Sequence, residues 1–190
     1  MNKRIASIIL AIVLALILWL PTLAAGNGTV TITMLTDKDV DITLEPTEWN
    51  IGDIEPNTEY VTKPTWCTVS NEGNCVVEIR IKGKNAMWID DPNAGESNAY
   101  EWKLSSDNTT AKRKYALWYH VARDDADSYT PITTIDTQMK KANGDVIKLV
   151  GNGVQKQFGL KLLTPKPDAN DYFYGDREME TTITISAVSA

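Results

Sequence analysis

His120 is the single histidine of the 190-residue chain, and histidine is the side chain best suited to proton transfer near neutral pH. Strand-like alternation along residues 115–121 places His120 on the face opposite Tyr119 and Val121, which predicts a solvent-facing strand histidine. A catalytic triad built on it would need a nucleophile and an orienting acid from elsewhere, and the chain contains no nucleophile-elbow motif. A glycine-rich phosphate loop is also missing from the sequence, so we expect no enzyme activity.

Closely spaced carboxylates make residues 124–128 the best metal-binding candidate. Asp124, Asp125 and Asp127 lie in a polar segment that is expected to be a surface loop, where they would present hard oxygen ligands of the kind that calcium prefers. The run does not match the EF-hand pattern, and acidic loops are also common as solvated turns. Calcium is the one cofactor that the sequence suggests, and a solvated loop is the alternative.

Cys67 and Cys75 are the only cysteines, and they flank the turn-forming residues 71–74. This segment is predicted to form a hairpin with one cysteine on each arm. Opposed hairpin residues bring their Cβ atoms close enough for a bridge, so we expect a disulfide in an exported chain. Zinc is the alternative, but two thiols and one histidine make a poor zinc site.

Tryptophan is abundant beyond residue 25, whereas phenylalanine occurs only twice in the chain. Tryptophan rings are therefore expected to supply much of the core. Trp66 and Trp118 alternate out of phase with the core positions predicted beside them, which would place both rings on an outer face. There they would form an aromatic platform for sugar rings. Core packing is the alternative for both residues.

The segments that must position these residues show period-two alternation. Alternating stretches occur at residues 29–34, 40–45, 75–82, 100–105 and 182–187, and Asn143-Gly144 is a strong hairpin signal. No stretch after residue 25 keeps a helical period for three turns. The sequence predicts an all-β protein, a single antiparallel β-sandwich of immunoglobulin-like or jelly-roll-like type over residues 26–190.

Residues 1–25 are typical of a secretory signal peptide. Lys3 and Arg4 precede an apolar run from Ile5 to Leu20, and Pro21 with small residues follows before Gly26. A retained hydrophobic helix, as in a pilin-like subunit, is the alternative. We therefore expect an extracellular or cell-surface location, with membrane contact only during export.

Cleavage would take the formal net charge from −6 to −8, because both basic residues leave with the signal. Such an acidic domain is a poor candidate for binding nucleic acid. The sequons at Asn27 and Asn108 are candidate glycosylation sites in an exported chain.

Both ends of the expected mature chain are free of charge. Residues 26–36 and 181–190 are rich in Thr and Ile and contain no proline, so they would be aggregation-prone if left as open edges. One solution is that they are ordinary first and last strands. The other is strand exchange, in which Val30, Ile32 and Met34 complete the sheet of a neighbouring subunit.

Turn and hairpin motifs suggest a family. The segment 49–57 (Trp-Asn-Ile-Gly-Asp-Ile-Glu-Pro-Asn) precedes 69–77 with its Asn-Glu-Gly-Asn turn, and a loop at 165–174 leads to the final strand at 181–185. This layout resembles the TasA/camelysin-like fibre subunits. The resemblance implies an extracellular fibre-forming β-sandwich.

Together these features predict a non-enzymatic cell-surface structural protein, a filament subunit whose main partner is another copy of itself. The first alternative is a secreted carbohydrate-binding or adhesion module that uses exposed tryptophans to bind cell-surface polysaccharide. The second alternative is a pilin-like subunit that retains its hydrophobic helix.

Overall fold

The computed structural model describes residues 37–96, 100–124, 128–167 and 177–190. The predictions for the signal peptide, the strand-exchange residues Val30, Ile32 and Met34, and the sequon at Asn27 lie outside these residues. Every regular element of the described chain is a β-strand, which confirms the all-β prediction. This part of the chain holds no helix that is long and apolar enough to cross a membrane.

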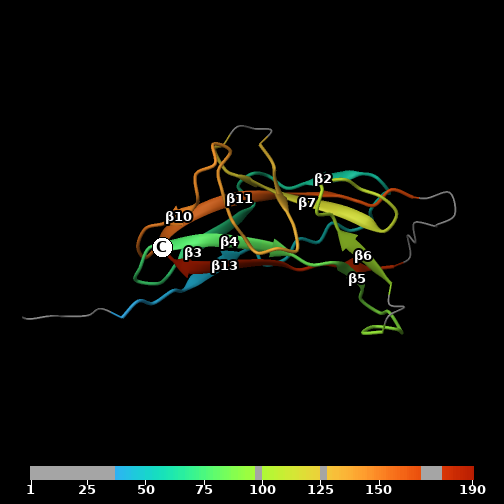
Figure 1. The fold of residues 1–190 in the computed structure, drawn as a ribbon, viewed down its shortest axis with the longest axis horizontal. Helices are drawn as coiled ribbons and strands as arrows, with labels where there is room; N and C mark the ends of the chain where they lie inside the picture. Colours follow the sequence, from blue (N-terminus) through green and yellow to red (C-terminus); the bar gives the residue numbers. More distant parts are fainter. Residues whose placement is uncertain (1–36, 97–99, 125–127, 168–176) are drawn as a thin grey trace, which may run out of the picture. The chain divides into compact units, whose positions relative to one another are not determined.

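The larger sheet has nine strands and is built around β11, which pairs with β2, β3 and β7 (Figure 1). Its path runs β1-β3-β11-β7-β6-β5-β12, with β2 attached to β11 and β8 attached to β7. The strands are β1 (Ile42–Glu45), β2 (Glu59–Val61), β3 (Cys67–Asn71), β5 (Ala86–Trp88), β6 (Glu101–Leu104), β7 (Lys114–Val121), β8 (Thr130–Ile132), β11 (Val154–Leu163) and β12 (Met179–Glu180).

The smaller sheet has four strands and is built around β4. On one side β4 (Val77–Gly83) pairs along its whole length with β13 (Ile183–Ser189), and it also pairs with β9 (Thr137–Gln138) and β10 (Lys148–Leu149). The hairpin predicted at Asn143-Gly144 lies between β9 and β10. Gly144 has a φ of 88°, and its N–H donates to the Lys141 carbonyl at 2.9 Å. The hairpin prediction is confirmed.

The expectation of a wholly antiparallel fold is wrong at one place, because β6 and β7 run parallel. In the loop between them, Asn108 and Arg113 both have positive φ. Asp107 holds this loop: its Oδ1 accepts hydrogen bonds from Thr109 Oγ1 at 2.8 Å and Lys114 Nζ at 2.5 Å. The loop returns the chain so that the first two residues of β7 lie beside the last two of β6, with Lys103 opposite Lys114 and Leu104 opposite Tyr115.

A single hydrophobic core contains residues from both sheets, and alternate side chains of the long strands supply it. The largest contributions are Val77, Ile79 and Ile81 from β4, Tyr115, Leu117, Tyr119 and Val121 from β7, and Phe158, Leu160 and Leu162 from β11. The hydroxyl groups of the two buried tyrosines are also satisfied: that of Tyr119 accepts a hydrogen bond from Lys140 N at 2.8 Å, and that of Tyr115 lies 2.7 Å from Thr181 Oγ1.

The hairpin predicted for residues 67–75 is also wrong. β3 joins the larger sheet and β4 the smaller one, so residues 72–76 cross between sheets instead of closing a hairpin. The crossing is held against the first described residues: a Cβ added to Gly73 would lie 2.2 Å from the Asp39 carbonyl oxygen. Only glycine fits this close backbone approach.

Candidate functional site

The free edge of β13 is the most unusual surface of the described chain. β13 ends the smaller sheet and pairs only with β4 among the described residues. Its sequence, Ile-Thr-Ile-Ser-Ala-Val-Ser, contains no charge and no proline. Edge strands are normally protected by charges, proline, bulges or short length. β13 has no charge and no proline, and at seven residues it is not short.

The hydrogen-bonding pattern identifies which groups the edge offers. Ala190 N donates to the Val76 carbonyl at 2.9 Å, on the β4 side. Alternation in an antiparallel pair then directs Thr184, Ser186 and Val188 toward β4 as well. The backbone groups of the intervening residues, which include Ile185 and Ala187, point to the open side. These same residues turn their side chains toward the core.

The described chain begins beside the end of this strand. Lys38 Nζ donates to Ser189 Oγ at 3.1 Å, and Asn74 Nδ2 donates to the Asp37 carbonyl at 2.9 Å. Asn74 Oδ1 also accepts from Asp39 N at 2.8 Å. These contacts fix residues 37–39 next to the carboxyl end of β13.

The predicted disulfide is not present: both cysteines are free thiols. Cys67 is at the start of β3, the far end of that strand from the crossing segment, where its thiol faces the Pro46 carbonyl at 3.7 Å. Cys75 follows the crossing, with its thiol 3.3 Å from the Asp39 carbonyl. Burial raises the pKa of Cys67 to about 11, partly offset by a backbone hydrogen bond. The failed hairpin explains the missing bridge.

His120 is buried, contrary to the prediction of a solvent-facing histidine. Only 3% of it is exposed, and neither ring nitrogen has a hydrogen-bond partner among the described residues. It pairs with Gly159 across β7 and β11, and the backbone of Lys63 covers that face, since a Cβ on Gly159 would lie 2.6 Å from the Lys63 carbonyl. Tyr129 packs edge-on against the imidazole with ring centroids 5.3 Å apart.

Trp118 lies on the outer face of the larger sheet, as alternation predicts, but it is not an open platform. Lys161 is its neighbour in the β7–β11 register, and its ammonium group lies 4.8 Å from the Trp118 ring and 4.2 Å from the Tyr129 ring. Lys161 also pairs with Glu59 at 3.5 Å. The cation occupies a position over the ring that a sugar would need.

Trp66 has a different environment. It is partly buried against the hydrophobic core and packs on Trp49 with ring centroids 6.0 Å apart. The two predicted platform residues are therefore in separate settings, Trp66 at the core and Trp118 under a lysine. The sequence placed Trp66 on the outer face by alternation from Cys67. Alternation does not apply there, because Trp66 precedes β3.

Of the predicted calcium ligands and the second sequon, the structure describes Asp124 and Asn108. Asp124 Oδ2 accepts a hydrogen bond from Ala142 N at 2.9 Å, and Asp125 and Asp127 lie outside the described residues. Among the residues that the structure describes, no group of three or more acidic, histidine or cysteine side chains is arranged to hold a metal. Asn108 is exposed, on the loop between β6 and β7.

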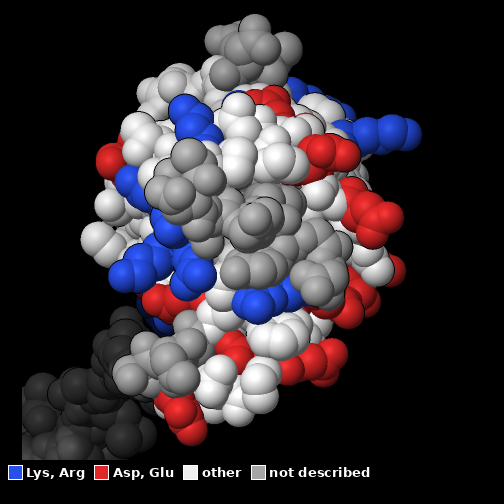
Figure 2. Space-filling model, turned by 90° about the vertical axis from the view of Figure 1, so that its right-hand side faces the viewer, with Lys and Arg blue, Asp and Glu red and all other residues white. Residues whose placement is uncertain are grey.

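Arginine–aromatic stacking organises the end of the molecule that carries β5 and β6. Arg177 lies over both Tyr100 and Trp88, with distances to the ring centroids of 4.2 and 4.4 Å, and Arg113 lies 4.3 Å from that of Tyr100. A hydrogen bond from the Tyr100 backbone holds the pKa of the Asp91 carboxyl below its usual range, and Arg177 adds to this effect. Figure 2 shows several basic side chains together on the left of this end and several acidic ones on its right, with a basic side chain also projecting at the upper right.

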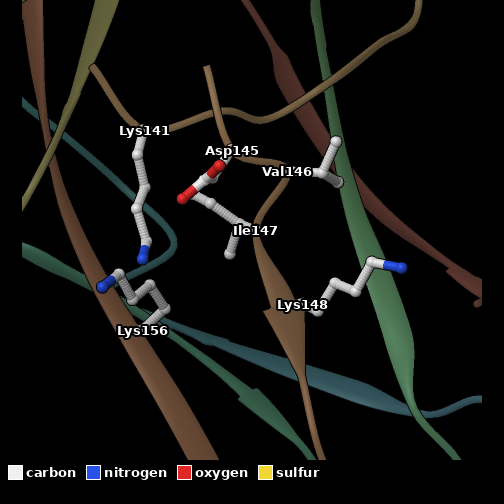
Figure 3. Close-up of a pocket in the computed structure, with 6 residues that line it drawn as sticks. All are labelled: Lys141, Asp145, Val146, Ile147, Lys148 and Lys156. Carbon is white, nitrogen blue, oxygen red and sulfur yellow. The ribbon is translucent and has the colours of Figure 1, made fainter. Parts of the chain in front are cut away.

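A lysine-lined pocket at the other end was not foreseen from the sequence. Its volume is about 590 Å³, and it is lined by Lys141, Asp145, Val146, Ile147, Lys148 and Lys156 (Figure 3). The three lysines come from the hairpin, β10 and β11 and are separated by up to fifteen positions along the sequence. No local motif unites them, so only the fold could bring them together.

The sequence matches no protein-family model and no curated protein.

Proposed function

We propose that this chain is a non-enzymatic structural protein of the cell surface that assembles into extracellular filaments. After export directed by residues 1–25, the domain folds as a two-layer β-sandwich. Residues 26–36 of one copy then pair with the free edge of β13 in the next copy. The partner is a second copy of the same chain.

The observation that carries this proposal is the unprotected edge of β13. It is long and uncharged, and its outward backbone groups have no partner strand in the described chain. An exposed edge of this kind is a template for another strand. An open edge of this kind is a liability in an exported protein, and a specific partner strand would cover it.

The N-terminal segment has the composition that this edge requires. It is uncharged, and Val30, Ile32 and Met34 alternate with threonines. Pairing with β13 would continue the core-facing row formed by Ile183, Ile185 and Ala187, which pack against the core from this strand. Burial of each donor side chain would contribute roughly 1.5–3 kcal/mol. A single ladder hydrogen bond contributes only about 1 kcal/mol, so the apolar side chains would determine register and affinity.

Removing the donor segment is the direct test. Chains of residues 26–190 and 37–190 are compared by electron microscopy and sedimentation, with circular dichroism as the check that both fold. We predict ordered fibres from the longer chain and soluble monomer from the shorter one.

A matched pair of substitutions separates side-chain chemistry from mere length. Ile32→Lys puts a charge in the core-facing row and should abolish fibres, whereas Thr33→Lys lies on the opposite face and should leave them. Fibres from the 37–190 chain, or a 26–190 chain that stays monomeric at high concentration, would refute the proposal.

A further inference from the structure

Two lysines converge in the pocket beside the 141–147 hairpin. Figure 3 shows the ammonium groups of Lys141 and Lys156 turned toward each other, with the Asp145 carboxylate on the same side. Lys148 points the other way, toward β4, where it forms an ion pair with Glu78 at 3.0 Å. Within the described residues, neither Lys141 nor Lys156 has an ion-pair partner within 4.0 Å.

The backbone fixes the positions from which these lysines extend. Lys141 N donates to the Asp145 carbonyl at 2.8 Å across the neck of the hairpin, and Asn143 Nδ2 donates to Asp145 Oδ2 at 2.8 Å. Lys156 lies opposite Val69 in the β11–β3 register, at an end of the larger sheet. The backbones that carry the charged groups are therefore held in place, and binding would order only the lysine side chains.

The charge balance selects the ligand. Lys141 and Lys156 together with Asp145 carry a formal charge of +1, because Lys148 is neutralised by Glu78. The two ammonium groups outnumber the one carboxylate beside them, and a bound anion would balance the excess positive charge. A monoanion such as a carboxylate would bring the three groups to zero net charge, whereas a dianion such as sulfate would leave the site negative.

The size and lining of the pocket suggest what carries the carboxylate. A volume of about 590 Å³ is much larger than one carboxyl group and falls in the range of small-molecule sites. The lining also includes Val146 and the buried Ile147, and Asp145 supplies an acceptor for hydroxyl groups. We propose that this pocket binds a carboxylate-bearing sugar, with Lys141 and Lys156 holding the carboxylate. This site is independent of the β13 edge and of filament assembly.

The test uses glucuronate as the probe, glucose as its neutral counterpart and sulfate as a dianion, with amide shifts in nuclear magnetic resonance spectra as the readout. We expect saturable shifts at residues 141–147 and 156 with glucuronate, none with glucose, and weaker binding of sulfate. Lys141→Gln and Lys156→Gln should each weaken glucuronate about tenfold, the effect of one charge-assisted contact. Lys103→Gln, on β6, is the control that changes net charge equally and should leave the affinity unchanged.

Asp145→Asn should change the glucuronate affinity in the opposite direction. It removes the negative charge beside the two ammonium groups and should tighten glucuronate severalfold. Unchanged binding in all three pocket variants, equal binding of glucose, or sulfate binding tighter than glucuronate would each overturn the assignment. Because the pocket is measured by ligand shifts on soluble protein, the result does not depend on whether the chain forms fibres.

Discussion

β1 and β13 both end a sheet, and both turn alternate side chains toward the same core, yet their outer edges are built differently. β1 is four residues long, is bracketed by Asp41 and the terminal Glu45, and is followed at once by Pro46. β13 is seven residues long and carries neither charge nor proline. The edge of the larger sheet has the usual protection against strand addition, and the edge of the smaller sheet lacks it.

The contrast indicates that the open edge is a local property and not a general one. The same chain that places carboxylates and proline around β1 leaves β13 bare, beside the point where residues 37–39 enter the domain. If both edges were bare, poor solubility would be the simpler explanation. A single bare edge, in a chain whose sequence also contains an uncharged, alternating segment at residues 26–36, favours specific pairing.

Blocking the β13 edge should have the largest effect. The Ala187 N–H points to the open side, so Ala187→Pro removes a donor from the edge without breaking a bond to β4. We expect a folded monomer and no fibres by electron microscopy. Ala187→Val is the matched control, because it adds a side chain of similar size and keeps the N–H. Fibres from the proline variant would show that another surface joins the copies.

Hydrogen exchange measures the comparison residue by residue. The amides of Ile185 and Ala187 should exchange quickly in the 37–190 chain and slow by at least about tenfold in fibres. Glu72 N donates to the Asp41 carbonyl, so alternation leaves the amides of Ile42 and Leu44 on the free side of β1. These should exchange at the same rate in monomer and fibre. Protection of β1 in place of β13 would reverse the assignment of the acceptor edge.

The two thiols provide a smaller, local check. Cys67 is 2% exposed, with its thiol near the Pro46 carbonyl, whereas Cys75 is partly exposed, with its thiol near the Asp39 carbonyl. Since the thiolate is the reactive form, alkylation at pH 8 should modify Cys75 first and leave Cys67 largely unmodified in the folded protein. Mass spectrometry without reduction should find two alkylatable thiols after unfolding. A mass lower by two hydrogens would show a bridge.

Alkaline pH should expose the burial of Cys67. Its pKa is raised from 9.0 to about 11 in the folded state, so the unfolded chain loses this proton more readily. The stabilisation is complete below pH 9 and is lost as the pH rises toward 11. Burial raises the pKa of Tyr115 from 10.0 to about 12 and adds a loss at higher pH. Cys67→Ala should therefore flatten the fall in unfolding free energy between pH 9 and 11, measured by urea titration.

Local pattern was enough to predict the longer strands but not the short ones, such as β2, β5 and β8, and not the strand partners. Alternation identified β4, β7 and β13, and Asn143-Gly144 identified the hairpin, because both signals depend on neighbouring residues. β3 pairs with β1 and β11, and Gly73 packs against Asp39; these are contacts between residues far apart in sequence, which spacing within residues 67–75 does not contain. The disulfide prediction failed for the same reason.

The candidate sites depend even more on long-range structure. His120 was expected at the surface because alternation gives only the side of the sheet, and the cover over that side comes from Lys63 and Tyr129. Trp118 was assigned to the correct face, but the lysine above it is on another strand. The pocket lysines are far apart in sequence, so no motif could reveal them.

Mixing two complementary variants tests the central claim most directly. The 37–190 chain keeps the β13 edge but has no donor segment, whereas the 26–190 chain with Ala187→Pro keeps the donor but has a blocked edge. Each should be monomeric alone, and the mixture should form a one-to-one heterodimer that grows no further, measured by analytical ultracentrifugation. Two monomers that never associate would contradict strand exchange between residues 26–36 and β13.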